Sequence, residues 1–165
     1  MDNVRGNARV SGDAAVYGNA WVYGNAWVLG DARVYGDARV YGNAVVSGNA
    51  RVSGDARVSG DAAVYGNAVV LGDARVYGDA RVYGNAVVLG DAVVYEPGHV
   101  IVVSGFLEAS FTVHRTVTGH QVNAGCQSFQ LTDDLERIAD ESSWSLPAGW
   151  THMRAALLPV TETWH

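Results

Sequence analysis

The side chains in this sequence that are best suited to catalysis are five histidines and one cysteine. An imidazole can act as a general base or bind a metal ion, and a thiol beside an imidazole can act as a nucleophile. The six residues are His99, His114, His120, Cys126, His152 and His165. All of them lie after residue 98, so any site built from them belongs to the last part of the chain.

The segment around His114 and Cys126 has the pattern of a β-hairpin, with its turn at residues 118–119. This register predicts that Phe111 lies opposite Cys126 and that His114 lies opposite Asn123. The thiol and the imidazole are then several residues apart. A Cys–His nucleophile pair is the alternative interpretation, but the register favours a buried structural cysteine. We therefore assign no catalytic residue, no metal site and no cofactor.

Residues 6–95 contain no histidine and consist of fifteen consecutive copies of one six-residue unit. Each copy reads Gly, then Asn or Asp, then Ala, any residue, Val, and finally Tyr, Ser or Leu. Side chains alternate along a strand, so Ala and Val face one side while the variable residue and the last residue face the other. Glycine tolerates a positive φ, and Asn and Asp tolerate left-handed backbone better than most residues. Each copy therefore predicts a short strand and a corner.

Three such strands and corners make a triangular coil of about eighteen residues, and the fifteen copies make about five coils. The interior of this prism would be filled by stacked Val and Ala side chains. Strands of successive coils pair in parallel, so that equivalent residues stack in columns. The sequence predicts an all-β solenoid.

The same repeat resembles the left-handed parallel β-helix of the hexapeptide-repeat superfamily. The aliphatic position of that family corresponds to Val10 and Val16 here, and its small position to Ala8 and Ala14. The resemblance implies that the coils are left-handed, which spacing and composition do not show.

The regular phase ends in the sixteenth unit, at residues 96–101, and we place the domain boundary there. Residues 1–101 are the expected β-helix, and residues 102–165 are the expected small α+β cap. The cap contains the hairpin described above and two predicted helices, over residues 133–139 and 148–158. Terminal units of solenoids commonly cover the open end of the last coil.

The C-terminal segment resembles the domain that follows hexapeptide repeats in uncharacterised phage and prophage proteins. The residues that carry this resemblance are Arg115, Thr116, Gly119, Val122, Gly125, Cys126 and Phe129. Those proteins often carry a second cysteine where this chain has Ala124. The resemblance implies a phage or prophage source and supplies no reaction.

Two enzymatic activities occur in the superfamily, and the distribution of histidines argues against both. Its acyltransferases resemble one another in using a histidine from a coil or its loop as general base, and its zinc anhydrases in placing several histidines on the coils. Here the coils contain no histidine, and no loop interrupts them. We therefore expect a chain that is not an enzyme, with a hexapeptide-type acyltransferase as the alternative.

Charge and composition favour an intracellular protein that does not bind nucleic acid or membranes. Residues 1–95 contain nine Asp and eight Arg, and the rest of the chain has eight acidic residues against three arginines, so no basic stripe is present. The single cysteine fits a reducing compartment. No apolar run approaches the ~20 residues of a membrane span, and no signal peptide is evident. We expect a cytoplasmic protein of a bacterial host.

Reading every eighteenth residue gives the outer faces of the predicted coils, and two of them have informative residues. One face combines aromatic and basic residues next to a column of aspartates. It contains Trp21, Tyr23, Arg39, Tyr41, Arg57, Arg75 and Tyr77. The arginines are placed to neutralise the aspartates, and a solvated, charge-balanced face is the simpler interpretation. The sharper hypothesis is a binding surface, because Tyr, Trp and Arg dominate binding hot spots.

The second informative face presents four neighbouring apolar residues in its last two coils. They are Val69, Leu71, Val87 and Leu89. Such a cluster is rarely left in water, so we expect it to contact either the cap or a second subunit.

These observations favour a non-catalytic binding or assembly module. We expect a homo-oligomer, with a trimer favoured because proteins of the superfamily resemble one another in that respect. A host protein or a small ligand is the expected further partner. A third hypothesis, based only on the resemblance of the C-terminal segment, is a phage protein that sequesters a host protein or small ligand.

Overall fold

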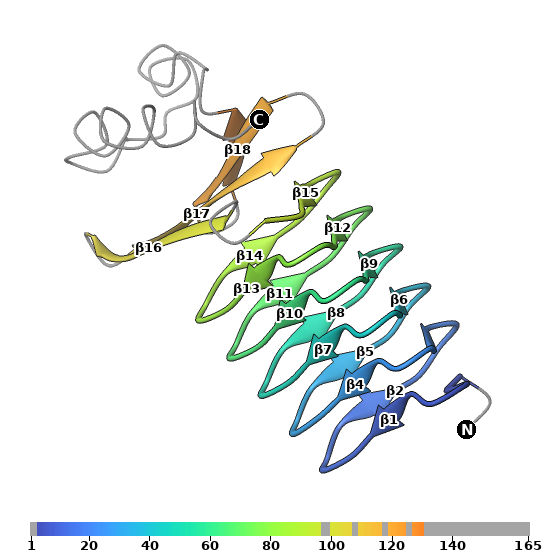
Figure 1. The fold of residues 1–165 in the computed structure, drawn as a ribbon. Helices are drawn as coiled ribbons and strands as arrows, with labels where there is room; N and C mark the ends of the chain where they lie inside the picture. Colours follow the sequence, from blue (N-terminus) through green and yellow to red (C-terminus); the bar gives the residue numbers. More distant parts are fainter. Residues whose placement is uncertain (1–2, 97–99, 107–108, 117–118, 125–126, 131–165) are drawn as a thin grey trace.

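The computed structural model describes residues 3–96, 100–106, 109–116, 119–124 and 127–130. In these residues the chain forms a parallel β-solenoid followed by a four-stranded antiparallel sheet (Figure 1). The coils are stacked along one axis, from the first coil near the N-terminus to β15.

Each six-residue unit contributes one strand of two residues, and every third strand belongs to the same sheet. The arginine face consists of β3 (Trp21–Val22), β6 (Arg39–Val40), β9 (Arg57–Val58), β12 (Arg75–Val76) and β15 (Val93–Val94). The valine–leucine face consists of β2 (Ala15–Val16), β5 (Arg33–Val34), β8 (Arg51–Val52), β11 (Val69–Val70) and β14 (Val87–Val88). The mixed face consists of β1 (Arg9–Val10), β4 (Trp27–Val28), β7 (Val45–Val46), β10 (Ala63–Val64) and β13 (Arg81–Val82). Three five-stranded parallel sheets confirm the predicted triangular β-helix of about five coils.

The corners of the coils require glycine. Gly54 has a φ of 70°, and a Cβ atom built on it would lie 2.9 Å from the backbone nitrogen of Gly72 in the next coil. An L-residue is strained at such a φ and has no room here for its side chain. The six-residue period of glycine in the sequence therefore follows from the stacking of one corner on the next.

The interior is formed by the Ala and Val side chains of the repeat. Every inward Ala and Val from Ala20 to Val94 has an exposed fraction of 0%. In contrast, Ala8, Val10 and Ala14 are only partly buried, because no coil lies below them. The predicted alternation of inward and outward residues is confirmed along the coils.

Asparagine side chains add a second ladder at the corners. The Nδ2 of Asn7 donates to Oδ1 of Asn25 at 3.2 Å, and Asn25 donates to Asn43 at 3.3 Å. Asn43 continues the ladder by donating to Asp61 at 2.9 Å. Each amide can both donate and accept, so a column of asparagines satisfies itself from coil to coil.

The C-terminal part of the described chain is an antiparallel sheet. Its strands are β16 (Val100–Phe106), β17 (Ala109–Thr116), β18 (Gly119–Ala124) and β19 (Gln127–Gln130), in that order across the sheet. Strand β17 lies against β14 and β15 at the end of the solenoid (Figure 1). The buried Thr112 accepts a hydrogen bond from the backbone N–H of Val87 at 3.1 Å through Oγ1. This sheet therefore contacts the edge of the last coil.

The predicted hairpin is confirmed, but its predicted register is wrong. Phe111 pairs with Ala124 and His114 pairs with Gln121. The strands are joined through residues 117–118, one position earlier than expected. In an antiparallel pair, moving the turn by one residue changes every partner by two. The helices predicted over residues 133–139 and 148–158, like Cys126, lie outside the described residues.

Candidate binding surface

The arginine face contains the residues that the sequence analysis predicted to form a binding surface. Its register stacks Trp21 on Arg39, Arg39 on Arg57, and Arg57 on Arg75. A second column lies beside this arginine column. Its members follow the arginine positions by two residues and come directly after each strand. The second column, called here the tyrosine column, consists of Tyr23, Tyr41, Ser59, Tyr77 and Tyr95.

The aromatic rings of the tyrosine column are stacked in two pairs. The ring centroids of Tyr23 and Tyr41 are 5.0 Å apart with an interplanar angle of 2°. Those of Tyr77 and Tyr95 are 5.7 Å apart at 23°. Stacking follows from the register, since rings at one position of successive coils are held about one strand spacing apart, ~4.8 Å. The column is interrupted at Ser59, where the side chain has no ring.

Trp21 has a partner that the sequence analysis missed. The guanidinium carbon of Arg5 lies 4.3 Å from the centroid of the Trp21 ring, which is a cation–π contact. Val4 forms a parallel bridge with Val22, so the chain before the first regular unit already follows the coil. Counting eighteen residues places Arg5 next to Tyr23 rather than Trp21, so the sequence alone did not reveal this contact.

The arginine face also carries the predicted column of acidic residues at its corner. The side chain of Asp37 accepts a hydrogen bond from Nδ2 of Asn19 at 3.1 Å. In the described part of the chain, no ion pair joins this column to Arg39, Arg57 or Arg75. The acidic residues occupy the corner, and the arginines occupy the strands of the flat face. The guanidinium groups are therefore available to other anions.

The four apolar residues of the valine–leucine face are placed as predicted. Val69 pairs with Val87 in the parallel ladder, and Val69, Leu71, Val87 and Leu89 are all half-buried. The backbone of Val87 donates to Thr112 of β17, so part of this face adjoins the antiparallel sheet.

The mixed face and the first coils of the valine–leucine face carry aromatic residues as well. Arg9 lies over the ring of Trp27, with its guanidinium carbon 5.3 Å from the centroid. Tyr65 and Tyr83 stack at 5.5 Å, and Tyr17 and Tyr35 stack at 5.1 Å. Aromatic stacking alone therefore does not distinguish the arginine face. The valine–leucine face also has two consecutive arginines, Arg33 and Arg51. The arginine face differs in having three consecutive arginines beside two stacked tyrosine pairs.

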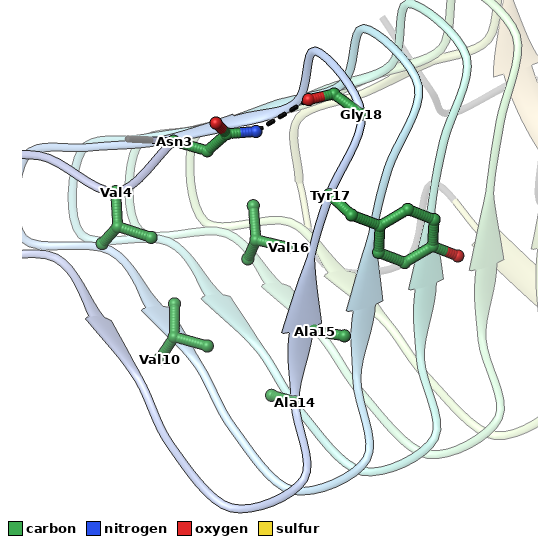
Figure 2. A pocket seen from close by; sticks show the side chains of 8 residues that line it. All are labelled: Asn3, Val4, Val10, Ala14, Ala15, Val16, Tyr17 and Gly18. Atoms are coloured by element: carbon green, nitrogen blue, oxygen red, sulfur yellow. Dashed lines mark hydrogen bonds between the residues drawn. The ribbon is translucent and has the colours of Figure 1, made fainter. Parts of the chain in front are cut away.

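A cavity of about 480 Å³ lies at the N-terminal end of the solenoid, and sequence reasoning did not predict it. Figure 2 shows that Val4, Val10 and Val16 point into the same space, whereas Tyr17 points to the other side of β2. Asn3 closes one side by donating from Nδ2 to the carbonyl oxygen of Gly18 at 2.9 Å. The cavity is the uncovered bottom of the hydrophobic core, and its lining holds neither a carboxylate nor an imidazole.

The described residues hold no group of three His, Cys, Asp or Glu side chains that could bind a metal ion. No helix among them has the length and apolarity needed to cross a membrane.

Comparison with known proteins identifies the repeat. The family described as YdcK β-solenoid repeat matches residues 14–30, 32–48, 46–60, 50–66, 56–72, 74–90 and 80–96. No curated protein and no solved structure matches the chain. Together with the three parallel sheets, the match shows that the chain is a repeat β-helix protein of the β-solenoid class. All matched residues lie in the coils.

Proposed function

We propose that this protein is a non-catalytic binding module whose arginine face recognises a protein partner. The observation that carries the proposal is the pairing of stacked tyrosines with a parallel column of arginines that make no ion pair within the described structure. Free guanidinium groups can bind carboxylates in a bidentate manner, and the neighbouring rings supply apolar area.

The rigidity of the solenoid supports this proposal. Each arginine of the face lies on a strand whose neighbouring Ala and Val are fully buried, and each tyrosine directly follows such a strand. The backbone hydrogen bonds between coils are 2.8–3.0 Å long along β3 and β6. Because the backbone is fixed before binding, little of its conformational entropy is lost in the complex. Large aromatic and arginine side chains on a fixed support are typical of binding hot spots.

Assembly is the second part of the proposal. The half-buried cluster Val69, Leu71, Val87 and Leu89 supports contact with another copy of the chain, and we propose a homo-oligomer. We also propose a phage or prophage source, based on the resemblance of the C-terminal segment. A location in the bacterial cytoplasm is proposed from the composition.

The test compares two variants with the same change of charge. In one, Arg39, Arg57 and Arg75 are replaced by Ser. In the other, Arg33, Arg51 and Arg81, which occupy the same position of the repeat on the other two faces, are replaced by Ser. Partners recovered with the tagged wild-type chain from its bacterial host are quantified for both variants. We expect recovery to fall at least about tenfold for the first variant only.

Two results would refute this assignment. Equal losses in the two variants would indicate a general effect of charge. Recovery that survives both variants but is lost when the chain ends at Ile101 would move the binding site to the C-terminal segment. A change of melting temperature on addition of acetyl-CoA would instead favour the acyltransferase alternative.

A further inference from the structure

The break in the tyrosine column has the dimensions of one missing aromatic ring. Tyr41 and Tyr77 lie two coils apart, with Ser59 between them, so their separation is about twice the strand spacing, ~9.6 Å. A ring placed midway would be ~4.8 Å from each neighbour. This matches the 5.0 Å between the centroids of Tyr23 and Tyr41 in the same column.

An arginine in an unusual environment lies beside this break. Arg57 is two residues before Ser59 in the same coil and on the same face. Of the eight arginines in residues 3–96, Arg57 alone is half-buried, and the other seven are exposed. Arg57 makes no ion pair in the described structure. A partly desolvated cation without a counter-ion binds a carboxylate more strongly than one in bulk water does.

The other two faces also have a serine in the tyrosine position of the same coil, but neither offers the same environment. Ser53 of the valine–leucine face is only 8% exposed and therefore closed. Ser47 of the mixed face has Tyr65 on one side only, with Leu29 on the other, and the residue beside it is Val45. Two aromatic walls and an adjacent arginine coincide only at Ser59 among the described coils.

We propose that the break at Ser59 receives an aromatic side chain from an acidic peptide segment of the partner. The ring would stack between Tyr41 and Tyr77, and carboxylates next to it in the peptide would pair with Arg57 and its neighbours in the column. This inference rests on the proposed function, because it specifies what the arginine face binds. Aromatic stacking favours offset parallel rings at these distances.

A peptide fits this surface better than a nucleic acid or a small ligand does. Small-ligand sites are concave and enclose most of the ligand, whereas this site is one position on a flat sheet face. A nucleic acid strand would stack its bases equally well, but its continuous phosphates would also meet acidic corners on both sides of the face. Those corners carry Asp37, Asp55, Asp73 and Asp91 on one side and Asp61 and Asp79 on the other.

The experiment measures binding of a dye-labelled peptide, Ser-Glu-Trp-Glu-Ser, to the full chain by fluorescence anisotropy. Ser59→Tyr fills the break and should weaken binding at least about tenfold. Ser47→Tyr adds the same side chain at the same repeat position on the mixed face of the same coil, and it should change binding less than about twofold. Peptides with Ala in place of Trp, or with Gln in place of both Glu residues, should bind the wild-type chain at least about tenfold more weakly.

A second variant separates blocked binding from misfolding. Tyr77→Ser removes one wall of the site, and it should also weaken binding, whereas Tyr65→Ser on the mixed face should not. Ser59→Tyr should melt at or above the wild-type temperature, because it completes the column of stacked rings.

The results that overturn this inference differ from those that overturn the proposed function. If the peptide binds Ser59→Tyr as well as wild type but does not bind the triple variant of Arg39, Arg57 and Arg75, the face binds peptides elsewhere and only the inference fails. If the peptide binds no form of the chain, or an oligothymidylate binds more tightly than the peptide, the inference also fails. If binding survives the triple variant, both fail.

Discussion

Neighbouring residues of one strand have opposite environments in this fold. Val40 has an exposed fraction of 0%, whereas Arg39, the residue before it in β6, is exposed on the arginine face. The interior at Val40 contains only Ala and Val side chains, so a polar group there has no partner. The effect of a charge therefore depends on which of the two adjacent positions receives it.

We predict that Val40→Asp lowers the free energy of unfolding by about 3 kcal/mol or more, because it buries a carboxyl group without a hydrogen-bond partner. Arg39→Asp should cost about 1 kcal/mol or less, because its side chain stays in water. Urea unfolding of both variants measures the difference. Equal midpoints would show that the assignment of inward and outward residues is wrong.

Substitution of a corner glycine can destabilise the fold in two ways, by backbone strain and by collision of the new side chain with the next coil. Two of the corner glycines allow these effects to be measured separately. Gly54 and Gly84 have φ angles of 70° and 66°, so alanine is strained at both. A Cβ at Gly54 would lie 2.9 Å from the nitrogen of Gly72, whereas no atom of the described residues lies within 4 Å of one at Gly84.

We predict that Gly84→Ala costs about 1–2 kcal/mol, the strain of one left-handed residue. Gly54→Ala should cost clearly more, because the next corner must also move to admit the methyl group. Chemical denaturation of the two variants gives the difference. If Gly84→Ala proves the more damaging, the glycine period is not set by stacking of corners.

At the scale of elements, the contact between the antiparallel sheet and the solenoid depends on a threonine. The hydroxyl of Thr112 in β17 accepts the N–H of Val87, a backbone group at the edge of the last coil. We predict that Thr112→Val lowers stability by about 1 kcal/mol, because it removes one part-buried hydrogen bond between the sheet and the solenoid. Thr112→Ser retains the oxygen and should cost less. Thermal unfolding of the two variants tests this, and identical losses would mean that packing rather than the hydrogen bond matters.

The repeat explains why the coils could be predicted from sequence and the C-terminal sheet only in part. Fifteen units in one phase leave a single arrangement in which Val40 is inside and Arg39 outside. The hairpin offers no such redundancy, and turns at residues 117–118 and 118–119 are both compatible with its alternating pattern. The observed register lines up Ile101, Val113, Val122 and Phe129 in one row across four strands, which pairwise reasoning on two strands does not reveal.

The binding surface was likewise only partly predictable. The columns of the arginine face follow from counting eighteen residues, and Ser59 is visible as an exception to the tyrosine column in the sequence itself. Three observations required the structure. They are the half-burial of Arg57, the cation–π contact of Arg5 with Trp21, and the lack of ion pairs between Arg39, Arg57, Arg75 and the acidic corner.

At the scale of the whole molecule, the solenoid is nearly neutral and has a half-buried apolar cluster on its valine–leucine face. We predict that the chain forms a homo-oligomer at micromolar concentration, and that this oligomer is a trimer. Replacing Leu71 and Leu89 by Ser should reduce the molar mass in solution, because it removes apolar area from that face. Tyr65 and Tyr83 replaced by Ser on the mixed face serve as the control. Light scattering that shows a monomeric wild-type chain would contradict the prediction.

The proposal that the arginine face binds the partner is tested most directly by site-specific photocrosslinking in the bacterial host. Benzoylphenylalanine replaces Tyr77 of the arginine face in one variant and Tyr83 of the mixed face in the other. The two tyrosines occupy the same position in consecutive units, and both are exposed, by 40% and 54%. We predict a specific crosslinked partner from position 77 that is absent from position 83. Crosslinking from position 83 alone, or equally from both, would contradict the account.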